Sequence, residues 1–152
     1  MKKLSSILVL MLIALMLFVS CNNSTPTKEE SVNSDEVKEA TPEEKELFRT
    51  LLRASIGAIS SKIQGNNIPN LELSDNTESA TFTGASFENI VLFGTASMGN
   101  TLKLNLTDGT KYNGVAHKLD CEGTQGENDT IIVTKLILDG KTLKYSDPIS
   151  LN

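Results

Sequence analysis

The chain of 152 residues has no tryptophan, one histidine and two cysteines, and aromatic residues make up only 5% of it. It also lacks the CxxC, HExxH, GxSxG and phosphate-loop patterns that carry common catalytic and metal chemistries. The single histidine, His117, has no nucleophile motif near it, and we interpret it as an ordinary strand residue. We therefore expect a protein without catalytic activity and without a cofactor.

Basic residues are also scarce, with 14 lysines and arginines against 19 aspartates and glutamates. No basic patch with interleaved aromatic residues occurs along the chain. Nucleic-acid binding depends on such a patch to neutralise phosphates. We expect no nucleic-acid partner.

A long hydrophobic run is missing too, because the apolar segment from Leu4 to Val19 is shorter than the roughly 20 residues that a membrane-spanning helix needs. Two lysines precede this segment and the small residue Ser20 follows it. This pattern is typical of a secretory signal peptide, which we predict over residues 1–20. The alternative is an uncleaved N-terminal membrane helix.

The end of this segment, Phe18-Val19-Ser20-Cys21, resembles the bacterial lipobox, with Phe18 in place of the usual leucine. The resemblance implies cleavage between Ser20 and Cys21, a diacylglyceryl group on the Cys21 thiol, and acylation of the new amine. Two or more acyl chains hold a protein stably on a bilayer. The alternative for Cys21 is a disulfide with Cys121. With Cys21 lipidated, Cys121 is alone, and we expect it in the core or as a surface bystander without a lowered thiolate pKa.

Residues 21–40 follow as the lipidated cysteine and a polar, acidic segment with almost no apolar residue. Such a segment cannot bury enough surface to fold, so we predict a disordered tether. Without the two lysines of residues 1–20, twelve basic and nineteen acidic residues leave a net charge of −7. The acidic tether is expected to hold the folded part away from an anionic membrane surface.

The folded domain is predicted over residues 41–152, and it begins with a helix. Thr41 suits the N-cap, Pro42 the first helical position, and Glu44 the third position of a capping box. Gly65 with the two asparagines after it ends the helix. One apolar stripe at helical spacing indicates a face packed on a core. It contains Leu47, Phe48, Leu51, Leu52, Ile56, Ile59 and Ile63.

After Pro69 the pattern becomes that of strands, with alternating apolar residues and Gly- or Asn-rich breaks. Asp108-Gly109 and Asp139-Gly140 each predict a hairpin, because Asp-Gly is a favoured two-residue turn. We predict an α+β fold in which one N-terminal amphipathic helix packs on an antiparallel meander of five to seven strands.

One stretch, DCEGTQGEND, gathers four acids in what reads as a glycine-rich loop. Calcium takes six or more oxygen ligands, so this loop is the one metal candidate. The spacing lacks the EF-hand pattern, however, and we expect solvated acids rather than a metal site. The candidate ligands are Asp120, Glu122, Glu127 and Asp129.

The MKKLSSILVL opening, the loose FVSC lipobox, the polar tether and the 16.4 kDa mass together resemble the small 16-kDa outer-membrane surface lipoproteins of Brachyspira-type intestinal spirochaetes. Motifs carry this resemblance only over the first quarter of the chain. It implies an outer-membrane antigen without known catalytic activity, in which Cys21 carries the anchor. We therefore expect a surface-exposed lipoprotein that acts as an antigen, adhesin or host-interaction module.

Two alternatives come from other classes. One is a periplasm-facing accessory lipoprotein, either an outer-membrane assembly factor or an inhibitor of lysozyme-type enzymes, with an envelope protein as its partner. The other is a binder of small ligands, which needs a sheet closed around a cavity. If the chain is an antigen, adhesin or host-interaction module, we expect the exposed loops TASMGN and CEGTQGEND to make its contacts.

Overall fold

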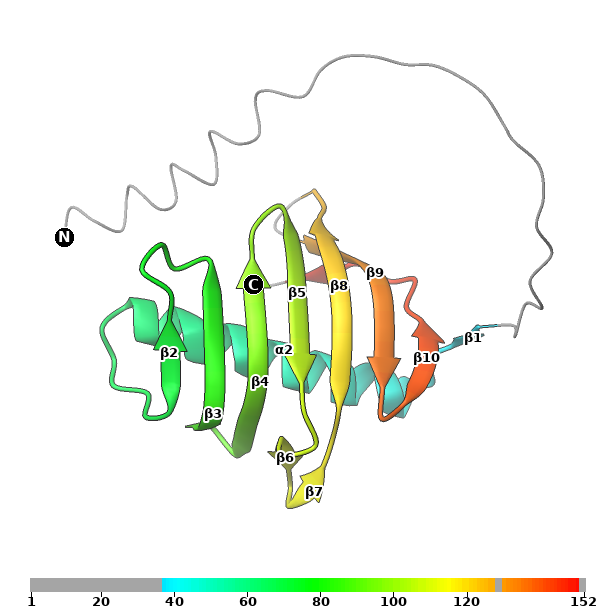
Figure 1. The fold of residues 1–152 in the computed structure, drawn as a ribbon. Coiled ribbons are helices and arrows are strands. Elements are labelled where there is room, and N and C mark those ends of the chain that lie inside the picture. The colour runs from blue at the N-terminus through cyan, green and yellow to red at the C-terminus, as the bar shows by residue number, and fades with distance from the viewer. Residues whose placement is uncertain (1–36, 128–129, 151–152) are drawn as a thin grey trace, which may run out of the picture. The chain divides into compact units, whose positions relative to one another are not determined.

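The computed structural model describes residues 37–127 and 130–150, so Ser20, Cys21 and most of the predicted tether lie outside it. The described part confirms the α+β class and a mostly antiparallel sheet (Figure 1). In chain order the elements are β1 (Lys38–Glu39), α2 (Pro42–Ile63), β2 (Leu71–Leu73), β3 (Ser79–Phe87), β4 (Ile90–Met98), β5 (Thr101–Leu106), β6 (Lys111–Tyr112), β7 (Val115–Ala116), β8 (Leu119–Gln125), β9 (Thr130–Leu138), β10 (Lys141–Lys144) and β11 (Ile149–Ser150).

Two parts of the predicted fold are wrong. The described residues form eleven strands rather than five to seven, because five two- or three-residue strands carry too little pattern to be recognised. The helix is also not the first element, since β1 precedes it and pairs in parallel with β10.

The strands lie in the order β1-β10-β9-β8-β5-β4-β3-β2, and α2 crosses behind them (Figure 1). Neighbours along the chain therefore lie side by side from β2 to β5 and again from β8 to β10, as in a meander. In the sequence the small β6–β7 hairpin comes between β5 and β8, although these two strands pair with each other in the sheet. β6 pairs with β4. β11 pairs with the beginning of β9.

The helix begins as the sequence predicts. The Thr41 hydroxyl accepts the Glu44 backbone N–H at 3.3 Å, and the Glu44 carboxylate accepts the Thr41 N–H at 3.0 Å. This capping box satisfies two of the four N–H groups that a helix start leaves unpaired. Gly65, with a φ of 91°, follows the last turn and ends the helix. Among the described residues, no helix is both long enough and apolar enough to cross a membrane.

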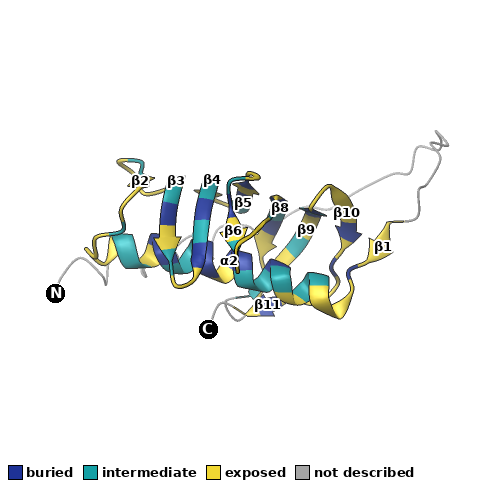
Figure 2. Cartoon of the chain, turned by 90° about the horizontal axis from the view of Figure 1, so that it is seen from below, coloured by how far each residue is buried: buried dark blue, intermediate teal, exposed yellow. Residues whose placement is uncertain are grey.

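One face of the sheet forms the core with α2, and we call it the covered face (Figure 2). Phe48, Leu51, Leu52 and Ala58 of the helix are fully buried against it. Ile63, the last residue of α2 and part of the predicted stripe, is exposed instead. In register across five strands, the buried strand residues include Ala80, Ala96, Leu104, Cys121 and Leu136.

Of the two predicted hairpins, the one at Asp139-Gly140 is confirmed and the one at Asp108-Gly109 is wrong. Asp139-Gly140 joins β9 to β10, with positive φ at both residues. Asp108-Gly109 lies in a turn closed by the Thr110 N–H and the Thr107 carbonyl, but β5 pairs with β8 rather than with the strand that follows. The hairpin turn in this region is Asn113-Gly114, between β6 and β7.

The predicted tether includes residues that the structure places in the domain. Lys38 and Glu39 form β1, and the Ala40 side chain is buried. The Lys45 ammonium lies 3.0 Å from the Glu39 carboxylate and 2.9 Å from that of Asp147. We call this group, with Ser146 hydrogen-bonded to Glu39, the edge clamp. It fastens β1 to the helix and to the chain beyond β10.

Candidate functional site

The sheet face opposite α2 carries no covering element among the described residues, and we call it the open face (Figure 1). Directly opposed residues of neighbouring strands share a face. The ladder register therefore aligns side chains in rows across the open face. The longest row crosses seven strands and consists of Glu72, Thr81, Thr95, Asn105, Asp120, Ile137 and Thr142.

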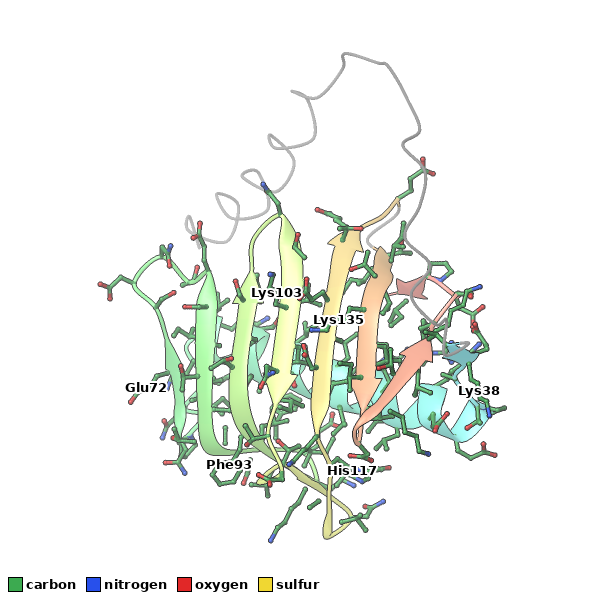
Figure 3. The ribbon with its side chains drawn as sticks, turned by 45° about the vertical axis from the view of Figure 1, so that its right-hand side comes forward. Lys38, Glu72, Phe93, Lys103, His117 and Lys135 are labelled. Carbon is green, nitrogen blue, oxygen red and sulfur yellow. The ribbon has the colours of Figure 1, made fainter. Side chains whose placement is uncertain are left out.

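A second row lies next to the first and crosses five strands, from β3 to β9. Its first two residues are short serines, and its last three are long charged side chains. Figure 3 labels two of these, Lys103 and Lys135, which come from β5 and β9 near the middle of the sheet. The row consists of Ser79, Ser97, Lys103, Glu122 and Lys135.

The charged side chains of the two rows pair with one another. The Lys135 ammonium lies 2.7 Å from the Asp120 carboxylate and 3.8 Å from that of Glu122. Glu122 in turn lies 3.7 Å from the Lys103 ammonium. The hydrogen bond to Asp120, together with the nearby charge of Glu122, raises the pKa of Lys135. The chain of two cations and two anions has no net charge.

Beside this ion-pair chain the open face is hollowed, with a volume of about 460 Å³. This value lies within the range of small-ligand sites, roughly 300–1,000 Å³. The short side chains of β3, β4 and β5 form its floor, and the longer Lys103, Asp120 and Glu122 border it. We call this hollow the polar hollow; its floor consists of Ser79, Thr81, Thr95, Ser97 and Asn105.

Phe93 lies on the same face, two residues before Thr95, at the end of the sheet near β6 (Figure 3). A methyl group at Gly109 would lie 2.8 Å from its ring and one at Gly84 would lie 3.0 Å away, so these two glycines allow the ring to approach the backbone closely. Buried Thr110 holds this strand: its hydroxyl donates to the Phe93 carbonyl and accepts the Phe93 N–H, each at 3.0 Å.

The acids that the sequence proposed as calcium ligands do not gather in one loop. Asp120 and Glu122 belong to β8 and are paired with lysines, whereas Glu127 follows that strand and Asp129 lies outside the described residues. Within residues 37–127 and 130–150 no three His, Cys, Asp or Glu side chains are placed to hold a metal ion. The TASMGN and CEGTQGEND segments, which we expected as loops, lie largely in β4 and β8.

Cys121 points to the covered face and is 3% exposed, so of the two positions left open by the sequence, core or surface, it occupies the core. Burial, with smaller contributions from the adjacent Asp120 and Glu122, raises the pKa of its thiol to about 12. A thiol with such a pKa is not a nucleophile at neutral pH.

His117 lies between β7 and β8 rather than within a strand, so its predicted placement is wrong. Its Nδ1 atom is 2.9 Å from the Asp139 carboxylate, whose other oxygen accepts the Lys118 backbone N–H at 2.8 Å. The pair holds the chain entering β8 against the β9–β10 turn. This contact gives His117 a structural role.

A second hollow, of about 440 Å³, lies where the first turns of α2 meet β6. It is wide and shallow, and its acidic members Glu43 and Glu46 are exposed to solvent. It brings no set of polar groups to one point. Its lining is formed by Pro42, Glu43, Glu46, Leu47, Thr50 and Tyr112.

Comparisons of the chain with protein-family models, with curated proteins and with solved structures find no match. The open face is the feature that sequence reasoning missed. Its one visible sign is the alternation of hydroxyl residues with apolar ones in SATFTGAS and in the end of β4. The ladder register places the charged residues of β8 and β9 in the same rows as these hydroxyls, with β5 between them.

Proposed function

We propose that the chain is a non-catalytic, lipid-anchored binding module of the bacterial outer membrane, exposed at the cell surface as an antigen, adhesin or host-interaction protein. The observation that supports a binding role is the open face, where polar side chains of β3, β4, β5 and β8 line a hollow that no described element covers. Active sites usually gather strongly perturbed titratable groups. On the open face, the titratable group whose pKa is shifted is Lys135. Its pKa is raised by the carboxylates of Asp120 and Glu122 with which it pairs, as in an ordinary ion pair.

Support for the anchor comes from the sequence alone, from the lipobox-like residues that end at Cys21. Acylation at that position supplies the bilayer partner of the chain. β1 begins at the edge of the sheet beside β10, away from the polar hollow. An anchor at the N-terminal side of β1 is thus compatible with a free open face.

The anchor is tested by replacing Cys21 with alanine in cells of a host that processes lipoproteins. We expect the wild-type chain in the detergent phase and Cys21→Ala in the aqueous phase. Cys121→Ala is the matched control, because it removes the other cysteine and should leave partitioning unchanged. Retention of Cys21→Ala in the detergent phase would mean that another segment holds the chain on the membrane.

Surface exposure is tested by treating intact cells with a protease and following the folded domain, with a periplasmic protein as the control. Loss of the domain while the control survives is the expected result. Protection until the outer membrane is opened would contradict surface exposure. It would favour the periplasm-facing assembly factor or inhibitor, whose envelope partner could then be captured by crosslinking.

A further inference from the structure

We propose that the polar hollow on the open face binds a neutral oligosaccharide. This proposal deepens the proposed function, since it rests on the open face being a binding surface and names the chemical class of its ligand. It follows from three properties of the hollow: its charge, its free hydrogen-bonding groups, and the side chains that it lacks.

The carboxylates that border the hollow are already paired with lysine. Glu122 lies between Lys103 and Lys135, and Asp120 pairs with Lys135. The lining carries the two carboxylates and one ammonium group, that of Lys103, while Lys135 stands outside it. An anionic ligand would meet both carboxylates, and a cationic ligand would have to compete with Lys135 for them. A ligand without net charge meets no such opposition.

The floor of the hollow, by contrast, offers groups that are not yet engaged. Among the described residues, the side chains of Thr81, Thr95, Ser97 and Asn105 make no hydrogen bond to another protein group. Hydroxyls and an amide both donate and accept, as sugar hydroxyls do. The threonine methyl groups add small apolar areas that suit the C–H faces of a pyranose ring. The floor therefore matches a ligand in which hydroxyl groups and C–H groups alternate.

A macromolecular surface fits the hollow less well. Protein interfaces draw most of their binding energy from buried tryptophan, tyrosine and arginine side chains. The aligned rows of the open face contain none of these, and the ring of Phe93 is already half-buried against the backbone near Gly84 and Gly109. A membrane surface calls for apolar or cationic side chains, and the hollow provides neither in excess.

The test is saturation-transfer NMR on the full chain purified in detergent. The probes are the tetramer of N-acetylglucosamine and maltotetraose at millimolar concentration, with anionic sialyllactose as the charge control. We expect transfer to at least one neutral tetramer and none to sialyllactose. Thr95→Val and Asn105→Leu together remove two floor groups, and at about 1 kcal/mol per hydrogen bond the affinity should fall at least about tenfold. Thr142→Val, on the same row but outside the hollow, should bind like the wild type.

Absence of transfer to both neutral tetramers would overturn the proposal, as would equal transfer to the wild type and to the Thr95→Val, Asn105→Leu double variant. Preferential transfer to sialyllactose would overturn it as well, because the paired carboxylates would then not decide the ligand. The same titration with Cys21→Ala separates this proposal from the anchor. Saccharide binding by a Cys21→Ala chain that still enters the detergent phase would refute the anchor and leave the polar hollow intact. A Cys21→Ala chain that moves to the aqueous phase, combined with no saccharide binding by either chain, would support the anchor and overturn the hollow.

Discussion

The covered and open faces of the sheet are formed by the same strands, but the side chains of one face are buried and those of the other are exposed to solvent. In β4, Leu92 and Ala96 are buried under the helix, whereas Thr95 and Ser97 alternate with Ala96 and are exposed. The covered face is close-packed, so each methylene there contributes to stability. The open face is solvated, so its side chains are free to be selected for what they bind. The comparison separates the residues that hold the fold from those that are available for function.

The largest expected effect is on the covered face. Phe48 is fully buried and meets Tyr145 edge-to-face, with ring centroids 5.1 Å apart. Phe48→Ala should lower the free energy of unfolding by about 3–5 kcal/mol, measured by urea denaturation. Arg53→Ala, an exposed position on the same helix, is the control and should change it by less than about 0.5 kcal/mol. Similar losses for both variants would mean that the helix is not held by its buried face.

A second comparison uses one thiol on each face, in the Cys21→Ala chain so that Cys121 is the only native thiol. Burial and a pKa of about 12 should protect Cys121 from a thiol reagent at pH 8. Adding Thr95→Cys places a second thiol on the open face, which should react at least about a hundredfold faster. The reagent's absorbance gives both rates, and in urea the two thiols should react alike. Equal rates in the native state would contradict the assignment of faces.

A smaller effect, which depends on pH, is expected at the edge clamp and at the neighbouring capping box of α2. The hydrogen bond from Lys45 lowers the pKa of Glu39 below its ordinary 4.5, and the Thr41 backbone N–H does the same for Glu44. Because folding favours the charged carboxylates, the stabilisation is complete above pH 4.5 and is lost as pH falls through the lowered values. We expect the urea midpoint to drop below pH 4.5.

The variant Lys45→Met isolates the Glu39 part of this effect, because it removes the cation that lowers the Glu39 pKa. Its urea midpoint should change less between pH 6 and pH 3 than that of the wild type. Lys144→Met, an exposed lysine of β10, is the control and should keep the wild-type pH dependence. An identical pH dependence for Lys45→Met and wild type would exclude the clamp as its source.

The smallest effect belongs to the open face itself. Thr95→Val keeps the shape and the β-branching of an exposed strand residue, so the free energy of unfolding should change by less than about 0.5 kcal/mol. Urea denaturation measures this change, and Thr142→Val serves as the comparison on the same face. A loss above 1 kcal/mol would mean that the open face also holds the fold.

Local chemistry explains what the sequence predicts well. The capping box at Thr41 and Glu44, the stop at Gly65 and the Asp139-Gly140 turn each depend on residues that are close together in the chain. In these cases a short-range rule and the final structure agree.

Long-range pairing explains what the sequence could not predict. After Asp108-Gly109 the chain does not return along β5, because β8 takes that edge through six paired residues and leaves β6 to pair with β4. Lys38 and Glu39 form a strand only because β10 offers them an edge. The polar hollow needs the register of β3, β4, β5 and β8 together, and no single segment contains that information.

The short first strand has a mechanical consequence. Tension applied to the chain ahead of Lys38 would load the two-residue pairing of β1 with β10 and the Glu39–Lys45 contact before it reached the buried helix. These few bonds would yield first and release residues 38–40, which lengthens the free chain by roughly 10 Å. The capping box and the core behind it would stay intact. β1 would then act as an extensible link, absorbing a pull that would otherwise strain the domain.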